Sequence, residues 1–450
     1  MSHSHNPEQE PTVSTGFSGN HLEGELAQAS SVDIYSDDLL RPIPVDQGEK
    51  VSGWKEVPLH ENHEPLVPLG PFTDRDDIFT SSVYYGEHSN SPYAHPDNQL
   101  EGALVTMFAR AEVADRLRSA QQLLPEGHHL IVLDSYRTLD VQQALYDHYF
   151  NALKAIHPDW DEQSLSAETQ RYVSLPSQDQ TRPSPHNTGG SVDLAIYRLP
   201  AEADQRVADI DLRLLELREQ APKDPSPAEE ASDPILRELY LLEMEKIGLV
   251  RRQAEFLNFG TQFDHGGIEA QLDYFEWLAG GRALRPSEVE SLAEGKLSQE
   301  MADFIQSGLA RPLTAQETEA RDNRRMLYNA MIGAGMQPYL DEWWHYNSPK
   351  SQMGAKVAGL DHAEYGGVEL DEPQLKHEKM RAAHRSGLVR IQERMLQGLD
   401  NYHLAGKLDL TDPTYQELIR LNERALSQTG DPRLTYLPKA VIIEPQSEAA

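Results

Sequence analysis

The chain has 450 residues, of which 73 are acidic and 40 basic, and its formal net charge is −33. This excess argues against nucleic acid or an anionic membrane as the main partner, because both attract cationic surfaces. There is no cysteine, which excludes disulfides, thiolate catalysis and cysteine-ligated zinc, so any transition metal would bind histidine and carboxylate. The length allows two or three domains.

The N-terminal part of the chain is polar. Met1 to Glu10 has neither a cationic start nor an apolar run, and no apolar stretch approaches the roughly 20 residues that span a bilayer. We therefore expect a cytoplasmic protein without membrane insertion. Residues 1–30 have the composition of a disordered tail. Residues 31–81 are punctuated by proline, which favours an extended arm laid over a domain.

The folded core is expected to begin near Ser82. Helical spacing of apolar residues predicts a helix over 103–124, and the apolar run 129–133 predicts a short strand that delivers Asp134-Ser-Tyr-Arg137 at its end. A helix should start near Asp140. Residues 191–197 alternate strictly, which predicts a strand that buries its aliphatic row and turns Asp193 toward the opposite face.

The second half of the chain is predicted to be mostly helical. Residues 202–255 show the spacing of an inserted helical hairpin, broken between Pro222 and Pro234. More helix is expected up to Ala334, with Gly335 as a C-cap before a strand over 337–346. Residues 350–450 form a predicted helical C-terminal extension, with helices over 388–399 and from Asp412 to Gly430. The core domain is expected to span 82–349, with the hairpin 202–255 inserted in it.

Two short blocks carry the chemistry, Ser184 to Asp193 and Asp341 to Tyr346. Between them they supply His186, Asp193 and His345, a three-ligand set that leaves a fourth zinc position open for water, and Glu342, a spare carboxylate suited to act as general base. A regular strand would place Glu342 and His345 on opposite faces, so we expect a bulge, twist or strand end there.

Each block also has a plainer interpretation. The first could be an ordinary surface contact of a histidine with an aspartate, and the second a tryptophan-rich core strand with a satisfied histidine. Arg137, at the end of a buried strand, suits either a structural salt bridge or the stabilisation of an oxyanion. The distinction depends on whether the three strand ends meet.

Three patterns in this chain order resemble the zinc D-alanyl-D-alanine dipeptidases of the VanX type: Asp134-x-Tyr-Arg137, Ser184-x-His186-x-x-Gly189-x-x-x-Asp193 and Glu342-x-Trp-His345. The resemblance implies a small α+β domain with a mixed sheet and flanking helices. It also implies one zinc ion on His186, Asp193 and His345, with Glu342 as general acid/base, Arg137 stabilising the transition state, and Ser184 and Asp264 near a D-Ala-D-Ala substrate. The chain departs from the family pattern at Ser191, usually alanine, and at Thr138, often proline.

Two other functions stay open at this point. A zinc D,D-carboxypeptidase that trims a peptidoglycan stem would use the same chemistry, and an inactive zinc-binding scaffold could hold a protein partner through its helical additions. Those additions could also form a homo-oligomer interface. The remaining histidines, including His265 beside Asp264, are expected to be exposed or to play ordinary packing roles.

Overall fold

A computed structural model describes residues 38–45, 53–87, 91–94, 100–173, 175–177, 179–222, 233–265, 267–295, 298–306, 311–379 and 381–382. The predicted tail 1–30 and the predicted helices over 388–399 and 412–430 lie outside these residues. In the described part of the chain, no helix is both long and apolar enough to cross a membrane.

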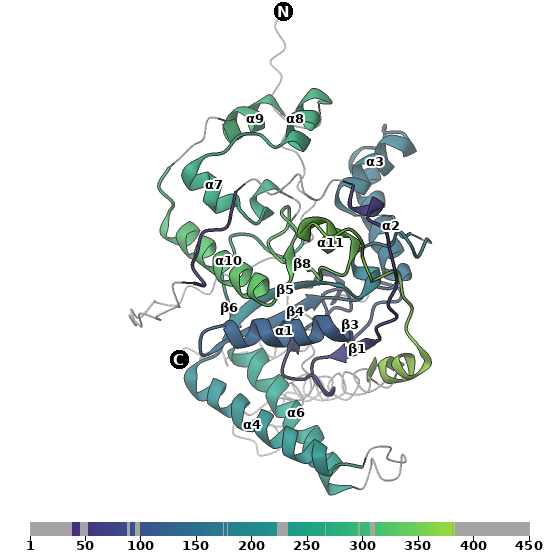
Figure 1. The fold of residues 1–450 in the computed structure, drawn as a ribbon, viewed down its shortest axis with the longest axis vertical. Coiled ribbons are helices and arrows are strands. Elements are labelled where there is room, and N and C mark those ends of the chain that lie inside the picture. Colours follow the sequence, from purple (N-terminus) through teal and green to yellow (C-terminus); the bar gives the residue numbers. More distant parts are fainter. Residues whose placement is uncertain are drawn as a thin grey trace, which may run out of the picture.

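The centre of the fold is a mixed sheet (Figure 1). Its strands follow the order β2, β4, β5, β8, β7, and β6 pairs with β5. Within this sheet β2 and β4 pair in parallel, whereas the other described pairings are antiparallel. The strand bounds are β2 Phe79–Thr80, β4 His128–Asp134, β5 Ser191–Arg198, β6 Glu255–Phe256, β7 Gln337–Pro338 and β8 His345–Asn347. With its flanking helices this confirms the predicted α+β class.

The register of the sheet brings the two sequence blocks together. Asp193 on β5 lies directly opposite His345 on β8, and on its other side it lies opposite Asp134 at the end of β4. The pairing of β4 with β5 is irregular between Val132 and Asp134. Residues about 150 positions apart in the chain therefore become cross-strand neighbours, whose Cβ atoms typically lie about 4.5–5.5 Å apart.

The predicted strands over 129–133 and 191–197 are confirmed. Nearly every residue of β4 and β5 is buried, so both faces of these central strands are covered by protein. The largest cluster of buried apolar residues joins these strands to α1 (Ala111–Leu123) and α10 (Ala315–Gly333), which pack on each other. The helix expected near Asp140 is α2 (Leu139–Ile156), capped by Thr138.

Helical additions lie at both ends of the molecule. The helical hairpin predicted over 202–255 is present as α4 and α6, which pack on each other and project at one end, whereas α7, α8 and α9 lie at the other (Figure 1). The bounds are α3 Glu162–Tyr172, α4 Ala201–Gln220, α6 Pro234–Gln253, α7 Tyr274–Gly280, α8 Pro286–Ala293, α9 Gln299–Gln306 and α11 Gln352–Ala358. Short 3-10 turns span Trp54–Glu56, Pro92–Ala94, His186–Thr188 and Ile268–Ala270.

The helix predicted over 103–124 is wrong in its first part. Met107–Arg110 is a strand, β3, and α1 begins only at Ala111. β3 pairs antiparallel with β1 (Leu66–Leu69), and all its residues are buried. A partner strand from the N-terminal arm thus overrides the helical spacing, as tertiary contacts often do.

The strand predicted over 337–346 is also wrong in its extent. It is a hairpin of the two short strands β7 and β8, with the segment from Tyr339 to Trp344 turning between them. The C-cap of α10 is Ala334, one residue before the predicted Gly335, which follows it in the left-handed conformation at φ +81°. Strands also begin before Ser82, because β1 and β2 both lie in the predicted arm. The division of the chain into domains itself stays a prediction.

Candidate metal centre

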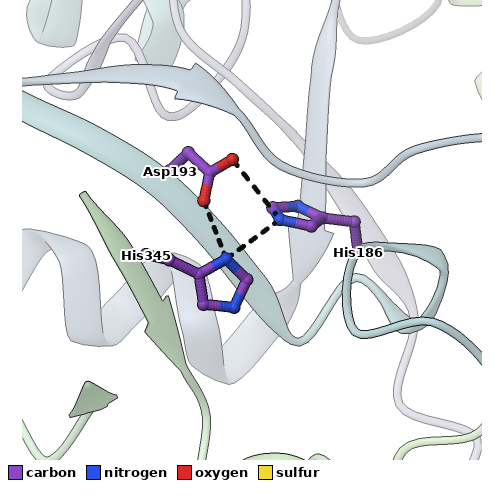
Figure 2. A group of neighbouring side chains, drawn as sticks. All are labelled: His186, Asp193 and His345. Carbon is purple, nitrogen blue, oxygen red and sulfur yellow. Dashed lines mark hydrogen bonds and ion pairs between the residues drawn. The ribbon is translucent and has the colours of Figure 1, made fainter. Parts of the chain in front are cut away.

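Three side chains converge at one point of the sheet. His186, Asp193 and His345 are all buried and offer ligand atoms within 4.8 Å of one another. Figure 2 shows the three groups turned toward a common centre. Nε2 of His186 lies 3.2 Å from Nδ1 of His345, and the two oxygens of Asp193 lie 3.4 Å and 2.9 Å from these nitrogens. Ligands of a tetrahedral zinc, each about 2.0–2.2 Å from the ion, lie roughly 3.3–3.6 Å apart.

Hydrogen bonds on the far side of each imidazole set its tautomer. Nδ1 of His186 lies 2.8 Å from the carbonyl oxygen of Ser135 and must donate to it, which leaves Nε2 with a lone pair. Nε2 of His345 lies 3.1 Å from Oδ1 of Asn347, an oxygen that also accepts a bond from Ser191. Nδ1 of His345 then carries the other lone pair.

The centre therefore consists of two lone pairs and a carboxylate that face one another. Oδ1 of Asp193 is buried, and besides Nδ1 of His345 at 2.9 Å it meets no hydrogen-bond donor among the described residues. A buried acceptor without a donor costs free energy, and three such acceptors in contact require a cation. One carboxylate and two imidazoles form a donor set typical of zinc, so the residues present fit that ion.

The electrostatics of the centre favour positive charge. Burial alone would lower the pKa of His186, but the carboxylates of Asp193 and Asp134 outweigh it and raise the pKa. Burial alone would raise the pKa of Asp193, but the imidazoles of His186 and His345 hold it well below its ordinary value. Positive charge is thus stabilised at this point whether a proton or a metal ion supplies it.

Glu342 lies beside the centre without joining the ligand set. Its Oε2 is 3.7 Å from Nδ1 of His345, and its side chain is 35% exposed. The predicted irregularity is confirmed: β8 begins only at His345, and Glu342 belongs to the turn before it, so the opposite-face rule of a strand does not apply. Desolvation, together with the charges of Asp193 and Asp264, raises the pKa of Glu342 to about 8.

Arg137 is held next to the first ligand. Its backbone N–H donates to the carbonyl of His186 at 3.2 Å, and its guanidinium donates to Oδ2 of Asp134 through Nε at 3.0 Å and Nη2 at 2.6 Å. The same carboxylate oxygen of Asp134 lies 3.3 Å from Nδ1 of His186. Asp134 thereby connects the guanidinium to the metal centre.

The structure also places the two predicted substrate residues. Asp264 accepts a 3.1 Å hydrogen bond from the hydroxyl of Tyr84, which in turn lies 3.2 Å from Nη2 of Arg137. Burial raises the pKa of Asp264 to about 6. Ser184 is buried, and its Oγ has no hydrogen-bond partner in the part of the chain that the structure describes.

Tyr84 was missed by sequence analysis. Its ring lies 4.7 Å from the Arg137 guanidinium, and its hydroxyl contacts both Arg137 and Asp264. It lies between β2 and β3, in a stretch where no periodicity or motif singles out one tyrosine. Asp134 belongs to the pattern Asp134-x-Tyr-Arg137, but its contact with His186 is visible only in the structure.

One comparison with known families gives a match. A family model described as D-ala-D-ala dipeptidase matches residues 301–363, a segment that runs from α9 to just beyond α11 and contains Glu342 and His345. The match supports this peptidase family, and with it a hydrolase. A search of curated proteins found no match to the chain.

Proposed function

We propose that this chain is a zinc-dependent dipeptidase of the VanX type that hydrolyses free D-Ala-D-Ala to two molecules of D-alanine. The observation that carries the proposal is the convergence of His186, Asp193 and His345 beside a carboxylate, Glu342, that is free of the ligand set. The family match over 301–363 supports peptidase chemistry and includes two of these four residues.

Zinc held by the two imidazoles and Asp193 would supply Lewis acidity, activating a water molecule and polarising the scissile carbonyl. The chain supplies the proton transfers. Glu342, which lies 3.7 Å from His345 and outside the ligand set, can take the proton of the attacking water and return it to the leaving amine. One carboxylate then serves as base and as acid in the same turnover.

Arg137 supplies fixed positive charge. A guanidinium near the scissile carbonyl stabilises the negative charge that develops on its oxygen during attack. Asp134 and Gln142 hold this guanidinium by hydrogen bonds of 2.6–3.0 Å, so it does not have to reorganise during the reaction. Preorganisation of this kind is what makes electrostatic stabilisation effective.

The substrate end of the proposal rests on Asp264 and Ser184. A free dipeptide carries an ammonium group, for which the buried carboxylate of Asp264 beside the Tyr84 hydroxyl is a suitable partner. An N-acylated substrate would place an uncharged amide against that carboxylate and leave the charge uncompensated. The unpartnered hydroxyl of Ser184 is available to the other end of the dipeptide.

The test is amino-acid release by the zinc-loaded full chain from D-Ala-D-Ala, N-acetyl-D-Ala-D-Ala and L-Ala-L-Ala, with Glu342→Ala as the control variant. Release from the free D,D-dipeptide alone, abolished in the control, is the expected result. Cleavage of the acetylated substrate alone would transfer the chain to the carboxypeptidases. Zinc binding without cleavage of any substrate would overturn the proposal in favour of a scaffold.

A further inference from the structure

Arg324 is a buried cation whose hydrogen bonds go to backbone carbonyls. It lies on α10 and is 1% exposed. Its Nε donates to the carbonyl oxygen of Phe259 at 2.8 Å, Nη1 to that of Gln271 at 2.5 Å and Nη2 to that of Glu269 at 2.7 Å. Placing a guanidinium in the interior is expensive, so three well-made bonds to one segment point to a specific task.

The three carbonyls belong to the two ends of one loop, hereafter called loop 259–271. The structure describes residues 259–265 and 267–271 of this loop. Phe259 begins it, and Glu269 and Gln271 end it, so the planar guanidinium holds its ends together. The neighbouring Asn323 adds a 2.8 Å bond to the carbonyl of Asn258. This part of α10 therefore acts as the base on which the loop is fixed.

Asp264 lies in the middle of this loop in a strained conformation. Its φ is +63°, in the left-handed region that residues other than glycine rarely adopt. Such strain persists only where the surrounding structure over-determines it, and it is concentrated at ligand-binding positions. The bonds from Arg324 are a source of that constraint.

The loop also contacts the turn that carries Glu342: the backbone N–H of Trp343 donates to the carbonyl of Ala270 at 3.0 Å, although the turn has backbone bonds of its own as well. The indole of Trp343 stacks on Phe259 at 4.2 Å between ring centres and donates to Oγ1 of Thr261 at 2.9 Å. Within the turn itself, the backbone N–H of Tyr339 donates to the carbonyl of His345 at 3.0 Å. Because the turn keeps these internal bonds whereas Asp264 lies within the loop itself, loosening the loop should disturb Asp264 more than Glu342.

We infer that Arg324 is a positioning residue that fixes loop 259–271 and, through it, holds Asp264 in place for the amino end of the substrate. The inference rests on the proposed function, which makes Asp264 the partner of the dipeptide ammonium. The rigid fork of a guanidinium can serve three carbonyls at once, whereas a lysine ammonium at the same place cannot span them. A lysine at position 324 should consequently hold the loop less firmly than the arginine does.

The experiment compares the zinc-loaded full-length wild type with Arg324→Lys and Arg324→Met. Arg325→Lys is the matched control, because Arg325 lies next to Arg324 on α10 but pairs with Glu276. We expect Arg324→Lys to raise KM for D-Ala-D-Ala about tenfold or more while kcat changes less than about threefold, since small misplacements of binding groups are costly. The control should leave KM within about twofold of the wild type, as an exchange away from the loop should. Unchanged KM in Arg324→Lys would overturn the inference.

A double-mutant cycle with Asp264→Asn tests whether the effect of Arg324→Lys on KM depends on Asp264. If Arg324 acts through Asp264, Arg324→Lys should raise KM much less in the Asp264→Asn background than in the wild type, because the group that it positions is already lost. Effects on KM that simply multiply would show independent action and overturn the inference. Arg324→Met, which removes the charge altogether, should lower activity further, but Arg324→Lys decides the outcome if the methionine variant fails to fold.

A readout independent of activity separates this inference from the proposed function. Amide hydrogen exchange should become faster within loop 259–271 in Arg324→Lys and stay unchanged in α4 and α6. If the wild type cleaves no dipeptide but this local change appears, the proposed function fails, whereas the role of Arg324 in fixing loop 259–271 is supported. If amide hydrogen exchange in the loop is unchanged in Arg324→Lys, Arg324 does not fix the loop and the inference is refuted.

Discussion

Asp134 is the residue on which the two charged parts of the site depend. It accepts two bonds from the Arg137 guanidinium and lies 3.3 Å from Nδ1 of His186. A carboxylate beside a histidine that binds a metal raises the basicity of the histidine, and losing such a partner typically costs about 10–100-fold in metal affinity. Asp134→Asn should therefore weaken zinc binding by about that factor and lower activity as well.

This prediction is checked by competing the protein for zinc against a chromophoric chelator. Asp115→Asn is the matched control, because Asp115 is 65% exposed and pairs only loosely, at 3.9 Å, with Arg118. Zinc affinity in the control should match the wild type. Equal affinity in Asp134→Asn would show that the contact with His186 contributes nothing to metal binding.

The three facing acceptors of the centre predict that metal removal destabilises the protein. Without a cation, Oδ1 of Asp193 and the two imidazole lone pairs are buried against one another. A ligand that binds only the folded state stabilises it by about 2.7 kcal/mol at a concentration roughly one hundred times its Kd. Chelation should therefore lower Tm, and added zinc should restore it.

The measurement is thermal unfolding at fixed protein concentration with a chelator and with a zinc series. His345→Ala should abolish the rise of Tm with zinc. His265→Ala should keep it, because His265 contacts Glu269 away from the ligand set. A Tm that is indifferent to zinc in the wild type would contradict a metal centre at His186, Asp193 and His345.

At the scale of elements, the hairpin of α4 and α6 carries buried charges that should make its stability depend on pH. Arg218 on α4 donates to Glu243 on α6 and to Asp76 before β2, both at 2.7 Å. Burial, and then the charge of Asp76, raise the pKa of Glu243 from its ordinary value of 4.5 to about 8. Between these two values the folded protein keeps a proton that the unfolded chain releases.

Because its folded-state pKa is the higher one, Glu243 contributes stability that is complete below pH 4.5 and is lost as the pH rises toward 8. The substitution Glu243→Gln should remove this dependence and stabilise the protein at alkaline pH, by up to about 5 kcal/mol. Urea unfolding in acidic and in mildly alkaline buffer measures the difference. Glu245→Gln, in an exposed pair with Arg206, should leave the dependence as in the wild type, and a slope unchanged in Glu243→Gln would refute the assignment.

Local pattern was enough to predict some elements and not others. The apolar run at β4, the alternation at β5 and the helical spacing of the hairpin each lie within one segment, so the sequence indicates them directly. The strand β3 depends on pairing with β1, some forty residues away, and its own spacing resembles a helix. Its partner in space decided its conformation.

The same distinction applies to the site. The side chains that converge at the centre belong to short motifs, which can be recognised in the sequence by their residue spacing. The contacts that hold them in place are not marked: Tyr84 meets Asp264 across 180 positions, and Arg324 reaches Phe259 across 65. Such contacts arise from the packing of α10 and the loops on the sheet, and no local pattern encodes them.

At the scale of the whole molecule, residues just beyond 350 support the candidate metal centre. The backbone N–H of Val368 donates to the carbonyl of Asn187, next to His186, and the carbonyl of Val368 accepts a 2.9 Å bond from Tyr136, next to Arg137. The carbonyl of Gly366 accepts a 3.1 Å bond from the buried Arg110. The segment 351–368 thus braces the turn that carries the first ligand. A role of the predicted C-terminal extension in oligomerisation stays a prediction.

These contacts predict different outcomes for two truncations. A chain ending at 349 should lose zinc binding, because the 186–189 turn loses its bonds to Val368 and Arg110 loses its bond to Gly366. A chain ending at 382 keeps every one of these contacts and should bind zinc as the full chain does. Zinc stoichiometry and near-ultraviolet circular dichroism of the two chains measure the difference. Full zinc binding by the shorter chain would show that the 186–189 turn keeps its conformation without the segment 351–368. The contacts that hold this turn would then lie within β4, β5 and β8 alone.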